Sequence, residues 1–460
     1  MPRPPKNRPQ RGRQDSKAAG PKSARSRAKI HQQDKIDLTR TLRRVVQHVA
    51  DRGDGLVHAQ APDQASSAEQ PAAYYVPNVL AGEVIEFAGA PQTGPQPAAG
   101  QLLRVIDPSA GRAETPCPHV EHCGGCQLQH ATADTIAAIK TARIKRALAQ
   151  QDLADITVYD AITAWDAQAG GSRRRMEFAL AHAGGEIHFG LHRRQSQQRV
   201  DIEVCPVSVP MIEQAIPALR QFAAMALEVG EQADCHVTAT DDGLDLVLTR
   251  KRPPSLDERL DWPAFIEAQG WPRLSWRARH PDPPETVVAF TNPTIHLGDH
   301  AVPIPAGGFL QASVQGQATL IDLVMGHIKA SDAARQCLDL FAGLGTFTLP
   351  LLADDEKRQV TAIDMAGSSL ESLREAGIPY GSRLMVEPRD LFRHPLDSAA
   401  LKNTDAIIFD PPRSGAEAQV EAIADSDVPL VIAVSCNPVS FARDARTLIK
   451  GGYAMSPVQP

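Results

Sequence analysis

The first hundred residues carry short apolar runs that are separated by polar and turn residues. These runs lie at 44–46, 55–57, 74–76, 84–87 and 102–106. Short strands of this kind, punctuated by glycine and aspartate, predict a small β-barrel. Two intervening stretches rich in small and polar residues are interpreted as loop insertions, at 59–73 and 88–100.

The middle of the chain alternates apolar and polar residues, which is typical of half-buried strands. Residues 176–180 and 244–248 show the alternation most clearly. A helix is expected at 131–150 and another near 211–228. The segment of about 155–300 is therefore predicted to form a mainly antiparallel sheet with one helix.

A third pattern begins near residue 315 with a helix at about 315–329. Continuous apolar runs then alternate with helical stretches, at 337–341, 360–363, 406–409 and 430–434. Such runs are typical of a parallel sheet that is covered by helices on both faces. The fold class is therefore α/β, with an N-terminal β-barrel, a central mainly antiparallel α+β domain and a C-terminal Rossmann-like domain.

The length of 460 residues suggests about three domains of roughly 150 residues each. We divide the chain into an arm, a barrel, a central domain and a C-terminal domain, at 1–40, 41–107, 108–304 and 305–460. No run approaches the roughly 18 apolar residues that a membrane-spanning helix needs. We therefore expect a protein without membrane contacts, and we expect it to be a monomer.

The net charge of −6 is unevenly distributed. Lysines and arginines are frequent from Arg3 to Arg44, whereas Asp15, Asp34 and Asp37 are the acids in that stretch. The arm is either a polyanion-binding tail or a solubilising terminus, because charge alone fits both. Seven cysteines, an odd number in a long chain, favour a reducing cytoplasm over a disulfide scaffold.

A glycine turn follows the first strand of the C-terminal domain. Gly343 and Gly345 come directly after the apolar run, and Asp364 closes the next run. Glycines at this point let the backbone approach a ligand at the carboxyl edge of the sheet. An acid after the next strand can accept the hydroxyls of a ribose, so the spacing favours a nucleoside cofactor over a plain tight turn.

Two further motifs end the next strands. In the first, Asp410 precedes two prolines and Arg413; the prolines stop the strand and stiffen the loop. In the second, Cys436 follows the last apolar run, where its thiol is placed to act as a nucleophile. A reactive thiolate needs a nearby cation or loop amides, and Arg413 or Arg443 could supply the charge. Two other cysteines, Cys337 and Cys235, lie inside apolar or strand segments and are expected to be core residues.

A cluster of cysteines lies between the barrel and the central domain. Cys117, Cys123 and Cys126 are close in sequence, and Cys205 is a distant fourth thiol. Four soft ligands can bind zinc or an iron–sulfur cluster, and the spacing does not choose between them. The adjacent glycines at 124 and 125 let the loop wrap a compact object. His119 and His122 are spare candidates, since four thiols already complete a ligand set.

Together these residues resemble the RNA 5-methyluridine methyltransferases, specifically the iron–sulfur branch that modifies 23S ribosomal RNA. The resemblance covers nearly the whole chain after the arm, and the barrel looks like a TRAM (OB-like) RNA-binding domain. It implies a class I methyltransferase domain and a [4Fe–4S] cluster held by Cys117, Cys123, Cys126 and Cys205. It implies that S-adenosylmethionine is bound by Gln311, Phe341, Gly343, Gly345, Thr346, Asp364, Asp390 and Asp410.

The resemblance also implies the roles of these residues. Asp364 takes the ribose-binding position, Asp390 faces the adenine, and Asp410 lies between the cofactor and the target base. Cys436 matches the nucleophile, which adds to C6 of uracil and so makes C5 reactive towards the methyl group. The target base must be unstacked, and the barrel, the central domain and the arm are expected to hold the RNA.

The chain departs from the family pattern at two places. Thr346 stands where the family commonly has asparagine, a tolerable change. The family has, after the position of Tyr453, a segment with the glutamate that serves as the base, and this segment is not found here. The sequence given ends at Pro460, which we expect to lie inside a sixth strand of the sheet. Turnover is then in question, and two alternatives stay open: a transfer RNA uridine methyltransferase, or an RNA- and cofactor-binding relic.

Overall fold

The structure is a computed structural model of the chain. It describes residues 36, 38, 41–58, 73–91, 96–164, 170–194, 196–331 and 334–460. The basic arm, apart from residues 36 and 38, and the insertion predicted at 59–73, apart from residue 73, lie outside the described residues. The chain divides into two compact units, one of 1–50 with 54–108 and one of 51–53 with 109–460.

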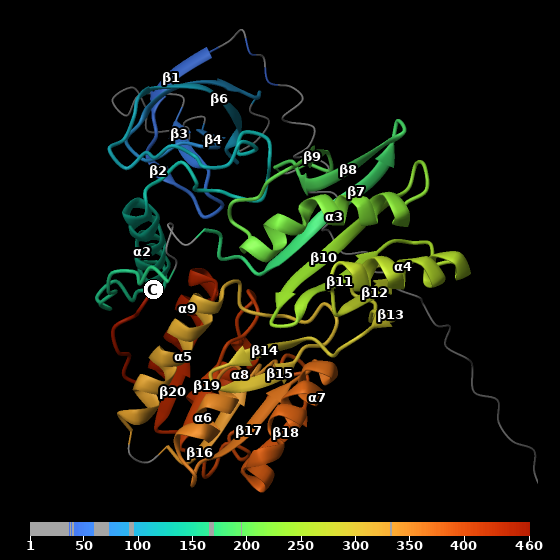
Figure 1. Ribbon diagram of the computed structural model, residues 1–460. Coiled ribbons are helices and arrows are strands. Elements are labelled where there is room, and N and C mark those ends of the chain that lie inside the picture. Colours follow the sequence, from blue (N-terminus) through green and yellow to red (C-terminus); the bar gives the residue numbers. More distant parts are fainter. Residues whose placement is uncertain are drawn as a thin grey trace, which may run out of the picture. The chain divides into compact units, whose positions relative to one another are not determined.

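The first unit contains a six-stranded sheet (Figure 1). Its strands are β1 (Thr41–Val45), β2 (His48–Val49), β3 (Gly55–His58), β4 (Ala73–Val76), β5 (Val84–Gly89) and β6 (Ala98–Asp107). They are ordered β1-β5-β6-β4-β3-β2, and all pairs except β4 with β6 are antiparallel. Val57, Val76, Ile85 and Phe87 are fully buried between them and form a core.

Whether the two edge strands of this sheet pair with each other decides whether it is a closed barrel. Its two edge strands, β1 and β2, follow each other along the chain with Val46 and Gln47 between them, and Gln47 N donates to Leu56 O. The pairing does not include a direct ladder between the edge strands among the described residues, so a closed barrel stays a prediction. The predicted loop at 88–100 is shorter than expected, because β5 and β6 take up both of its ends.

The second unit begins with the cysteine-bearing loop and α2 (Ala133–Ala149), and continues into a seven-stranded sheet. The strands are β7 (Arg175–Ala183), β8 (Glu186–His192), β9 (Arg199–Asp201), β10 (Gln232–Thr240), β11 (Gly243–Thr249), β12 (Arg273–Arg277) and β13 (Glu285–Ala289). The order is β13-β12-β11-β10-β7-β8-β9, and only β11 with β12 is parallel. This confirms the mainly antiparallel sheet. One face packs against α3 (Pro210–Ala226) through residues such as Phe178, Leu246 and Phe222.

The central sheet is covered by a second helix that the sequence pattern did not predict, α4 (Leu256–Ala268). The prediction of one helix was therefore wrong. A capping box starts α4, in which Glu258 N donates to Ser255 Oγ at 3.2 Å and Ser255 N donates to Glu258 Oε2 at 2.7 Å. Only Trp262 and Ile266 of this helix are buried, so its apolar periodicity is weak.

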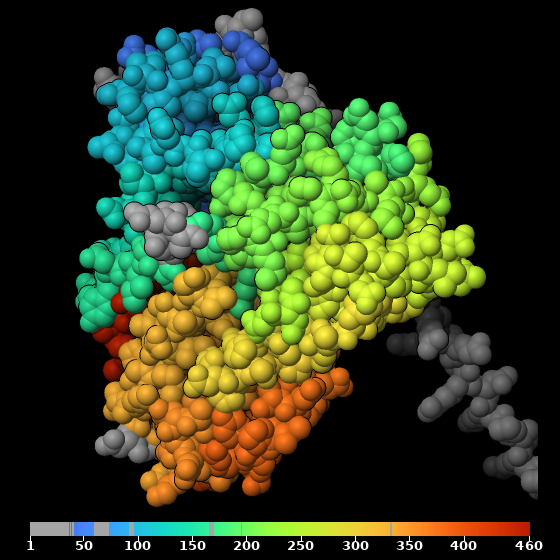
Figure 2. Space-filling view, viewed as in Figure 1, coloured from blue at the N-terminus to red at the C-terminus, as the bar shows by residue number. Residues whose placement is uncertain are grey.

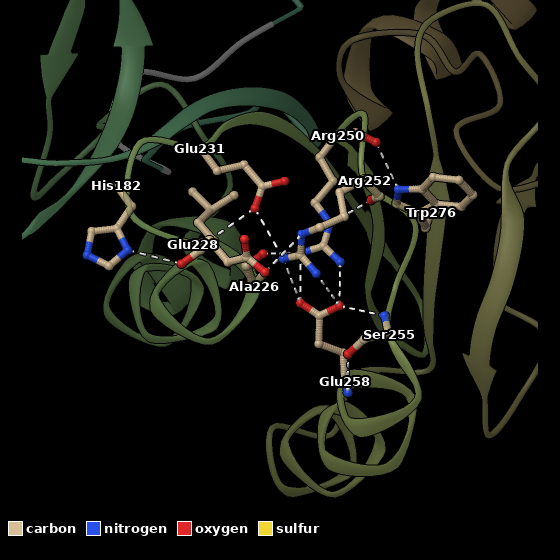
Figure 3. Close-up of polar contacts among 10 residues, drawn as sticks. His182, Ala226, Glu228, Glu231, Arg250, Arg252, Ser255, Glu258 and Trp276 are labelled. Atoms are coloured by element: carbon tan, nitrogen blue, oxygen red, sulfur yellow. Dashed lines mark hydrogen bonds and ion pairs between the residues drawn. The ribbon is translucent and has the colours of Figure 1, made fainter.

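Glu258 also anchors a polar network that fixes α4 to the sheet (Figure 3). The guanidinium of Arg250, whose side chain is fully buried, donates to both carboxylate oxygens of Glu258, at 2.9 and 2.6 Å. Arg250 also donates to Ala226 O at the end of α3 and lies 5.0 Å from the ring centroid of Trp262. Arg252 adds two bonds to the same carboxylate, at 3.0 Å each.

A small hairpin connects the central sheet to the C-terminal sheet. It consists of β14 (Thr294–Leu297) and β15 (His300–Pro303). In Figure 2 the yellow residues of this region lie between the green residues of the central sheet and the orange residues of the C-terminal sheet. Ile295, Leu297 and Val302 are buried against a helix of the C-terminal sheet.

The C-terminal sheet is parallel, as predicted, with helices on both faces (Figure 1). Its strands are β16 (Gln336–Leu340), β17 (Gln359–Asp364), β18 (Leu384–Pro388), β19 (Ala406–Phe409) and β20 (Leu430–Ala433). Its helices are α5 (Val314–Lys329), α6 (Thr348–Asp354), α7 (Gly367–Ala376), a 3-10 helix (Ile378–Arg383), α8 (Glu417–Ala424) and α9 (Pro438–Lys450). One buried cluster joins α5 and α6 to one face, and another joins α8 and α9 to the other.

The end of the chain differs from the prediction. The sheet has the order β18-β17-β16-β19-β20, and residues after α9 form no sixth strand in it. Instead, Val458 N donates to Thr157 O at 2.9 Å, and Tyr159 N donates to Val458 O at 2.9 Å. Pro457 and Pro460 explain part of this outcome, because a proline cannot donate to a ladder. Among the described residues, no helix has the length and apolar composition needed to cross a membrane.

Candidate active site

The predicted site residues follow the carboxyl ends of five adjacent parallel strands. Phe341 follows β16, Asp364 ends β17, and Asp390 comes just after β18. Asp410 follows β19, and Cys436 comes shortly after β20. Because parallel strands all end at the same edge of a sheet, their order places these residues along one edge, from Asp390 to Cys436.

Asp364 holds the glycine turn in place. Gly343 N donates to its Oδ2 at 3.0 Å, and Ala366 N donates to its Oδ1 at 2.7 Å. Gly345 has a φ of +88°, and a Cβ there would lie 2.4 Å from Leu373 Cδ1, so a larger residue would strain the backbone and displace Leu373. Each carboxylate oxygen keeps a lone pair, which leaves Asp364 able to accept further hydrogen bonds from a ligand.

An aromatic pair lies beside this turn. Phe341 has a φ of +63°, which is unusual for a bulky residue, and its ring centroid is 5.5 Å from that of Phe392. Asp390 accepts hydrogen bonds from Phe392 N at 3.0 Å and from Arg393 N at 3.2 Å, so it shapes the loop that carries the second ring. Thr346 is half-buried on the turn.

Gln311 reaches the sheet edge from the segment before α5. Its Nε2 donates to Asp410 Oδ2 at 3.1 Å. Burial raises the pKa of Asp410 to about 6, although the bond from Gln311 acts in the opposite direction. Arg174, which the sequence pattern did not single out, fixes Gln311 by donating to its backbone oxygen at 3.0 Å and to Gln317 Oε1 at 2.6 Å.

A second residue that the sequence analysis missed is Asp339, in the middle of β16. It is fully buried and accepts a hydrogen bond from Thr348 Oγ1 at 2.6 Å, while its Oδ1 has no partner among the described residues. Burial raises the pKa of Asp339 to about 7, and the charges of Asp410 and Asp364 act in the same direction. The signal in the sequence that could have found it is an acidic residue inside an apolar run, just before the glycine turn at 343–345.

Cys436 lies in an exposed loop that is tied to the loop after Asp410. Asn437 Nδ2 donates to Arg413 O at 2.7 Å, and Val434 N donates to Phe409 O at 2.9 Å. Asn437 is also the N-cap of α9, since its side chain accepts from the N–H of the second helical residue. The two motifs that the sequence placed on separate strands therefore lie next to each other.

The two arginines that were expected to assist the thiol differ in their surroundings. Arg443 is engaged elsewhere, because it pairs with Asp444 at 2.7 Å and with Glu417 at 3.3 Å. Arg413 is exposed, and its guanidinium forms no ion pair within the part of the chain that the structure describes. Cys337 and Cys235 are buried in apolar clusters, which confirms them as core residues.

The four remaining cysteines line one cavity. Cys117, Cys123 and Cys126 come from the loop after the first unit, and Cys205 comes from the loop after β9. The cavity has a volume of about 150 Å³. Burial raises the pKa of Cys126 to about 11, and the neighbouring Cys205 adds to the shift. His119 also lines the cavity, with its Nε2 unpartnered among the described residues.

The loop around this cavity depends on a close backbone approach. Gly124 N donates to His192 O at 2.9 Å, and a Cβ at Gly124 would lie 2.9 Å from backbone atoms of Arg194. As the described side chains stand, no three histidines, cysteines or acids are close enough to hold one metal ion. The structure therefore brings the four predicted thiols together without forming a compact single-ion site.

Known proteins are similar to this chain over most of its length. An uncharacterised RNA methyltransferase of Mesorhizobium japonicum is 34% identical over 417 residues, which cover 90% of this chain and 93% of that protein. The chain belongs to the RNA methyltransferases. An uncharacterised RNA methyltransferase of Caulobacter vibrioides is also 34% identical, over 84% of this methyltransferase and 90% of that protein. No protein-family model matches the chain.

Two more distant proteins carry more specific names. A 23S rRNA (uracil(1939)-C(5))-methyltransferase of Halomonas elongata is 29% identical, over 77% of this chain and 74% of that protein. The crystal structure of the tRNA (uracil-54, C5)-methyltransferase of Pyrococcus abyssi, in complex with S-adenosyl-L-homocysteine, shares the fold with a TM-score of 0.63. The two chains are 19% identical in sequence. The likeness covers 88% of this RNA methyltransferase and 92% of the Pyrococcus abyssi chain.

Proposed function

We propose that this RNA methyltransferase transfers a methyl group from S-adenosylmethionine to C5 of a uracil in RNA, with 23S ribosomal RNA as the substrate. The observation that carries the proposal is the pair of hydrogen bonds that join the Cys436 loop to the strand end and loop around Asp410, from Asn437 to Arg413 and from Val434 to Phe409. Cys436 and Asp410 follow the carboxyl ends of adjacent strands, β20 and β19, so a thiol and a carboxylate lie at the same edge of the sheet. The Halomonas elongata relative, named for uracil C5 of 23S rRNA, supports the choice of substrate.

The residues at the sheet edge fit S-adenosylmethionine. Asp364 offers free lone pairs for ribose hydroxyls, and the rings of Phe341 and Phe392 offer an apolar surface for an adenine. The cofactor is a cation at its sulfonium, and the carboxylate of Asp410 supplies the complementary charge. We assign Gln311, Gly343, Gly345, Thr346 and Asp390 to the same binding site, as the sequence analysis did.

In the proposed reaction, the Cys436 thiolate adds to C6 of the uracil ring. The new Sγ–C6 bond pushes the electrons of the C5–C6 double bond towards O4, so C5 becomes a carbon nucleophile. When bound, S-adenosylmethionine supplies an electrophilic methyl group. Loss of the C5 proton then restores the double bond as the Sγ–C6 bond breaks. We assign no residue of this chain to the removal of that proton.

Asp410 and Gln311 hold the reacting groups in this proposal. The amide of Gln311 fixes one carboxylate oxygen of Asp410, which leaves the other free for the base or the cofactor. With a pKa of about 6, Asp410 is mostly ionised at neutral pH and can face a cation. Arg174 is a positioning residue, since it holds the backbone of Gln311.

We further propose that Cys117, Cys123, Cys126 and Cys205 hold a [4Fe–4S] cluster. Their shared cavity of about 150 Å³ is several times the ~30 Å³ share of one water, so it suits an object of several atoms better than one ion. Four thiols that line one cavity, with burial raising the pKa of Cys126, are stabilised as thiolates only by a cationic guest. The cluster would hold the cysteine loop against the central sheet, a structural role.

Purified protein, S-adenosylmethionine labelled in its methyl group and RNA transcripts test the proposal. The product RNA is digested to nucleosides and separated, and label in 5-methyluridine is the expected result. Cys436→Ser should abolish the label, whereas Asp322→Asn, at an exposed position on α5, should retain it. Label in another nucleoside, or equal label with Cys436→Ser, contradicts the proposal.

Transfer RNA is the second candidate substrate. The fold likeness to the Pyrococcus abyssi enzyme, which acts on a tRNA uridine, favours it. Transcripts of 23S ribosomal RNA and of transfer RNA, offered separately, distinguish the two. A third outcome, cofactor binding without methyl transfer to either RNA, would instead support a binding protein.

A further inference from the structure

The central sheet has a polar face that the proposed function leaves unused. Every second residue along these strands packs against α3, as Met176, Cys235 and Leu274 do. The intervening positions point to the other face. They place Arg175 on β7, His236 on β10, and Ser275 and Arg277 on β12.

Two arginines on this face lack acidic partners. Arg175 donates from Nη1 to Gly308 O at 3.3 Å and lies 4.7 Å from the ring centroid of Phe309, but its buried Nε has no partner among the described residues. Arg277 is 8% exposed and donates from Nε to Thr249 Oγ1 at 2.9 Å. Neither guanidinium is within ion-pair distance of a carboxylate in the described ranges.

A third arginine on this face, Arg273, has an acidic partner, Asp245. Arg273 donates to both carboxylate oxygens of Asp245, at 2.8 and 2.9 Å, and to Ile304 O at 2.9 Å. The fold thus provides an acid for one buried guanidinium and leaves the other two without one. Arg277 is buried and Arg175 is half-buried, and a desolvated charge without an acid is unfavourable unless a ligand offsets it, so their positions point to an anion.

His236 completes the arrangement between the two arginines. Its Nε2 is buried without a partner, and so is the hydroxyl of Ser275 two strands away, among the described residues. Burial lowers the pKa of His236 to about 4, and the charges of Arg175 and Arg277 act in the same direction. Three acids lie on the same face: Glu177, which is exposed and opposite His236 on β7; Asp234, two residues before His236 on β10; and Asp245, which is paired with Arg273. All the unpartnered groups can donate hydrogen bonds, as the oxygens of a phosphate require.

This arrangement is joined to the candidate active site. Arg175 holds Gly308, three residues before Gln311, and the neighbouring Arg174 holds Gln311 itself. Gln311 in turn donates to Asp410. The loop that Arg175 contacts at Gly308 therefore continues to Gln311 and Asp410, so this face and the candidate active site share one loop.

We propose that Arg175, His236 and Arg277 form a subsite for a phosphodiester of the RNA that flanks the target nucleotide. This inference rests on the proposed function. The subsite positions the strand without reading its sequence, as phosphate contacts do. It accounts for the two unpaired guanidinium groups, which the cofactor site and the cysteine cavity do not use.

The test measures binding of a fluorescein-labelled RNA stem–loop, with uridines in its loop, by fluorescence anisotropy at several KCl concentrations. Loss of one phosphate contact lowers the slope of log K against log salt by about 0.7 for a single strand. Arg277→Gln should show this loss, and Arg277→Lys should restore most of it. Arg259→Gln is the matched control, because Arg259 lies on α4 at the other face of the sheet and is paired with Glu285.

A second variant, Glu177→Gln, changes an exposed residue and should therefore fold normally. Glu177 is exposed, and Glu177→Gln removes a charge that repels phosphate, so RNA should bind about two- to fivefold more tightly at low salt. An unchanged slope with folded Arg277→Gln overturns the inference. If that variant does not fold, unchanged or weaker binding by Glu177→Gln overturns it.

The same proteins are assayed for methyl transfer to keep the two proposals apart. Methylation by the wild type together with an unaltered salt slope in Arg277→Gln removes the subsite and leaves the proposed function. An Arg277-dependent slope without any methylation supports the subsite and removes the proposed function. A wild type that binds no RNA removes both.

Discussion

Replacing Asp410 by asparagine should stabilise the folded chain while it removes methyl transfer. Burial raises the pKa of Asp410 from its ordinary 3.8 to about 6, against the hydrogen bond from Gln311. The ionised carboxylate is therefore less favourable in the folded chain than in the unfolded chain. An asparagine keeps an oxygen that accepts the bond from Gln311 Nε2, but it carries no charge.

The magnitude follows from the shift. The difference between 3.8 and about 6 corresponds to about 3 kcal/mol. The folded chain binds this proton more tightly, so the free energy of unfolding falls as the pH rises from about 4 to about 6, and the whole loss is present above that range. At pH 5 about half of the loss has developed. Since the side chain is only partly buried, we expect about 1–3 kcal/mol of stabilisation in Asp410→Asn at pH 8.

Thermal unfolding at pH 5 and pH 8 measures the effect. The melting temperature of Asp410→Asn should exceed that of the wild type by roughly 2–4 °C per kcal/mol, with the larger gain at pH 8. Asp322→Asn, an exposed position on α5, is the control and should change neither value. Methyl transfer by Asp410→Asn should fall by about 10²-fold or more. A gain in melting temperature over the wild type that is no larger at pH 8 than at pH 5 would refute the reasoning.

Three further substitutions test other parts of the structure. Glu258→Gln should lower the free energy of unfolding by about 3 kcal/mol at pH 7, because Arg250 stays buried without its acid. Burial opposes ionisation of Glu258, but the hydrogen bonds from Arg250 and Arg252 lower its pKa to about 2. The stabilisation by the ionised carboxylate is therefore fully present above about pH 4.5 and is lost towards pH 2. Urea unfolding should show a smaller difference in stability between the wild type and Glu258→Gln at pH 3 than at pH 7. Asn437→Asp keeps the helix cap and loses the donor to Arg413 O, so rapid-quench assays should find slower methyl transfer at an unchanged melting temperature; an unchanged rate would argue against the tie. Cys126→Ser should lower the iron and sulfide content of anaerobically purified protein, and stoichiometric zinc in the wild type would contradict the cluster.

The sequence was most informative where one kind of residue dominates a segment. The run 406–409 is apolar throughout and is buried throughout, because a central parallel strand is covered on both faces. The helix α4 was missed because Pro263 lies inside it, where proline is unusual, and because only two of its residues are buried. Its capping box, Ser255 with Glu258, was the signal that could have predicted it.

The candidate site was predictable in its parts and not in its connections. A strand end places Asp410 and Cys436 on the same edge, since that follows from parallel pairing. The contacts of Arg174 with Gln311, and of Asn437 with Arg413, join residues that are far apart in sequence, and no local pattern encodes them. The end of the chain was wrongly placed in the sheet for the same reason: its partner, Val158, lies far away in sequence.

The most direct measurement of the central claim uses RNA that contains 5-fluorouridine. Fluorine at C5 cannot leave as a proton does, so the covalent protein–RNA bond should persist after the methyl group has been transferred. We predict a species of lower mobility on a denaturing gel that needs S-adenosylmethionine, and mass spectrometry of its peptides should locate the methylated 5-fluorouridine on Cys436. No such species, or attachment at another residue, would contradict the account.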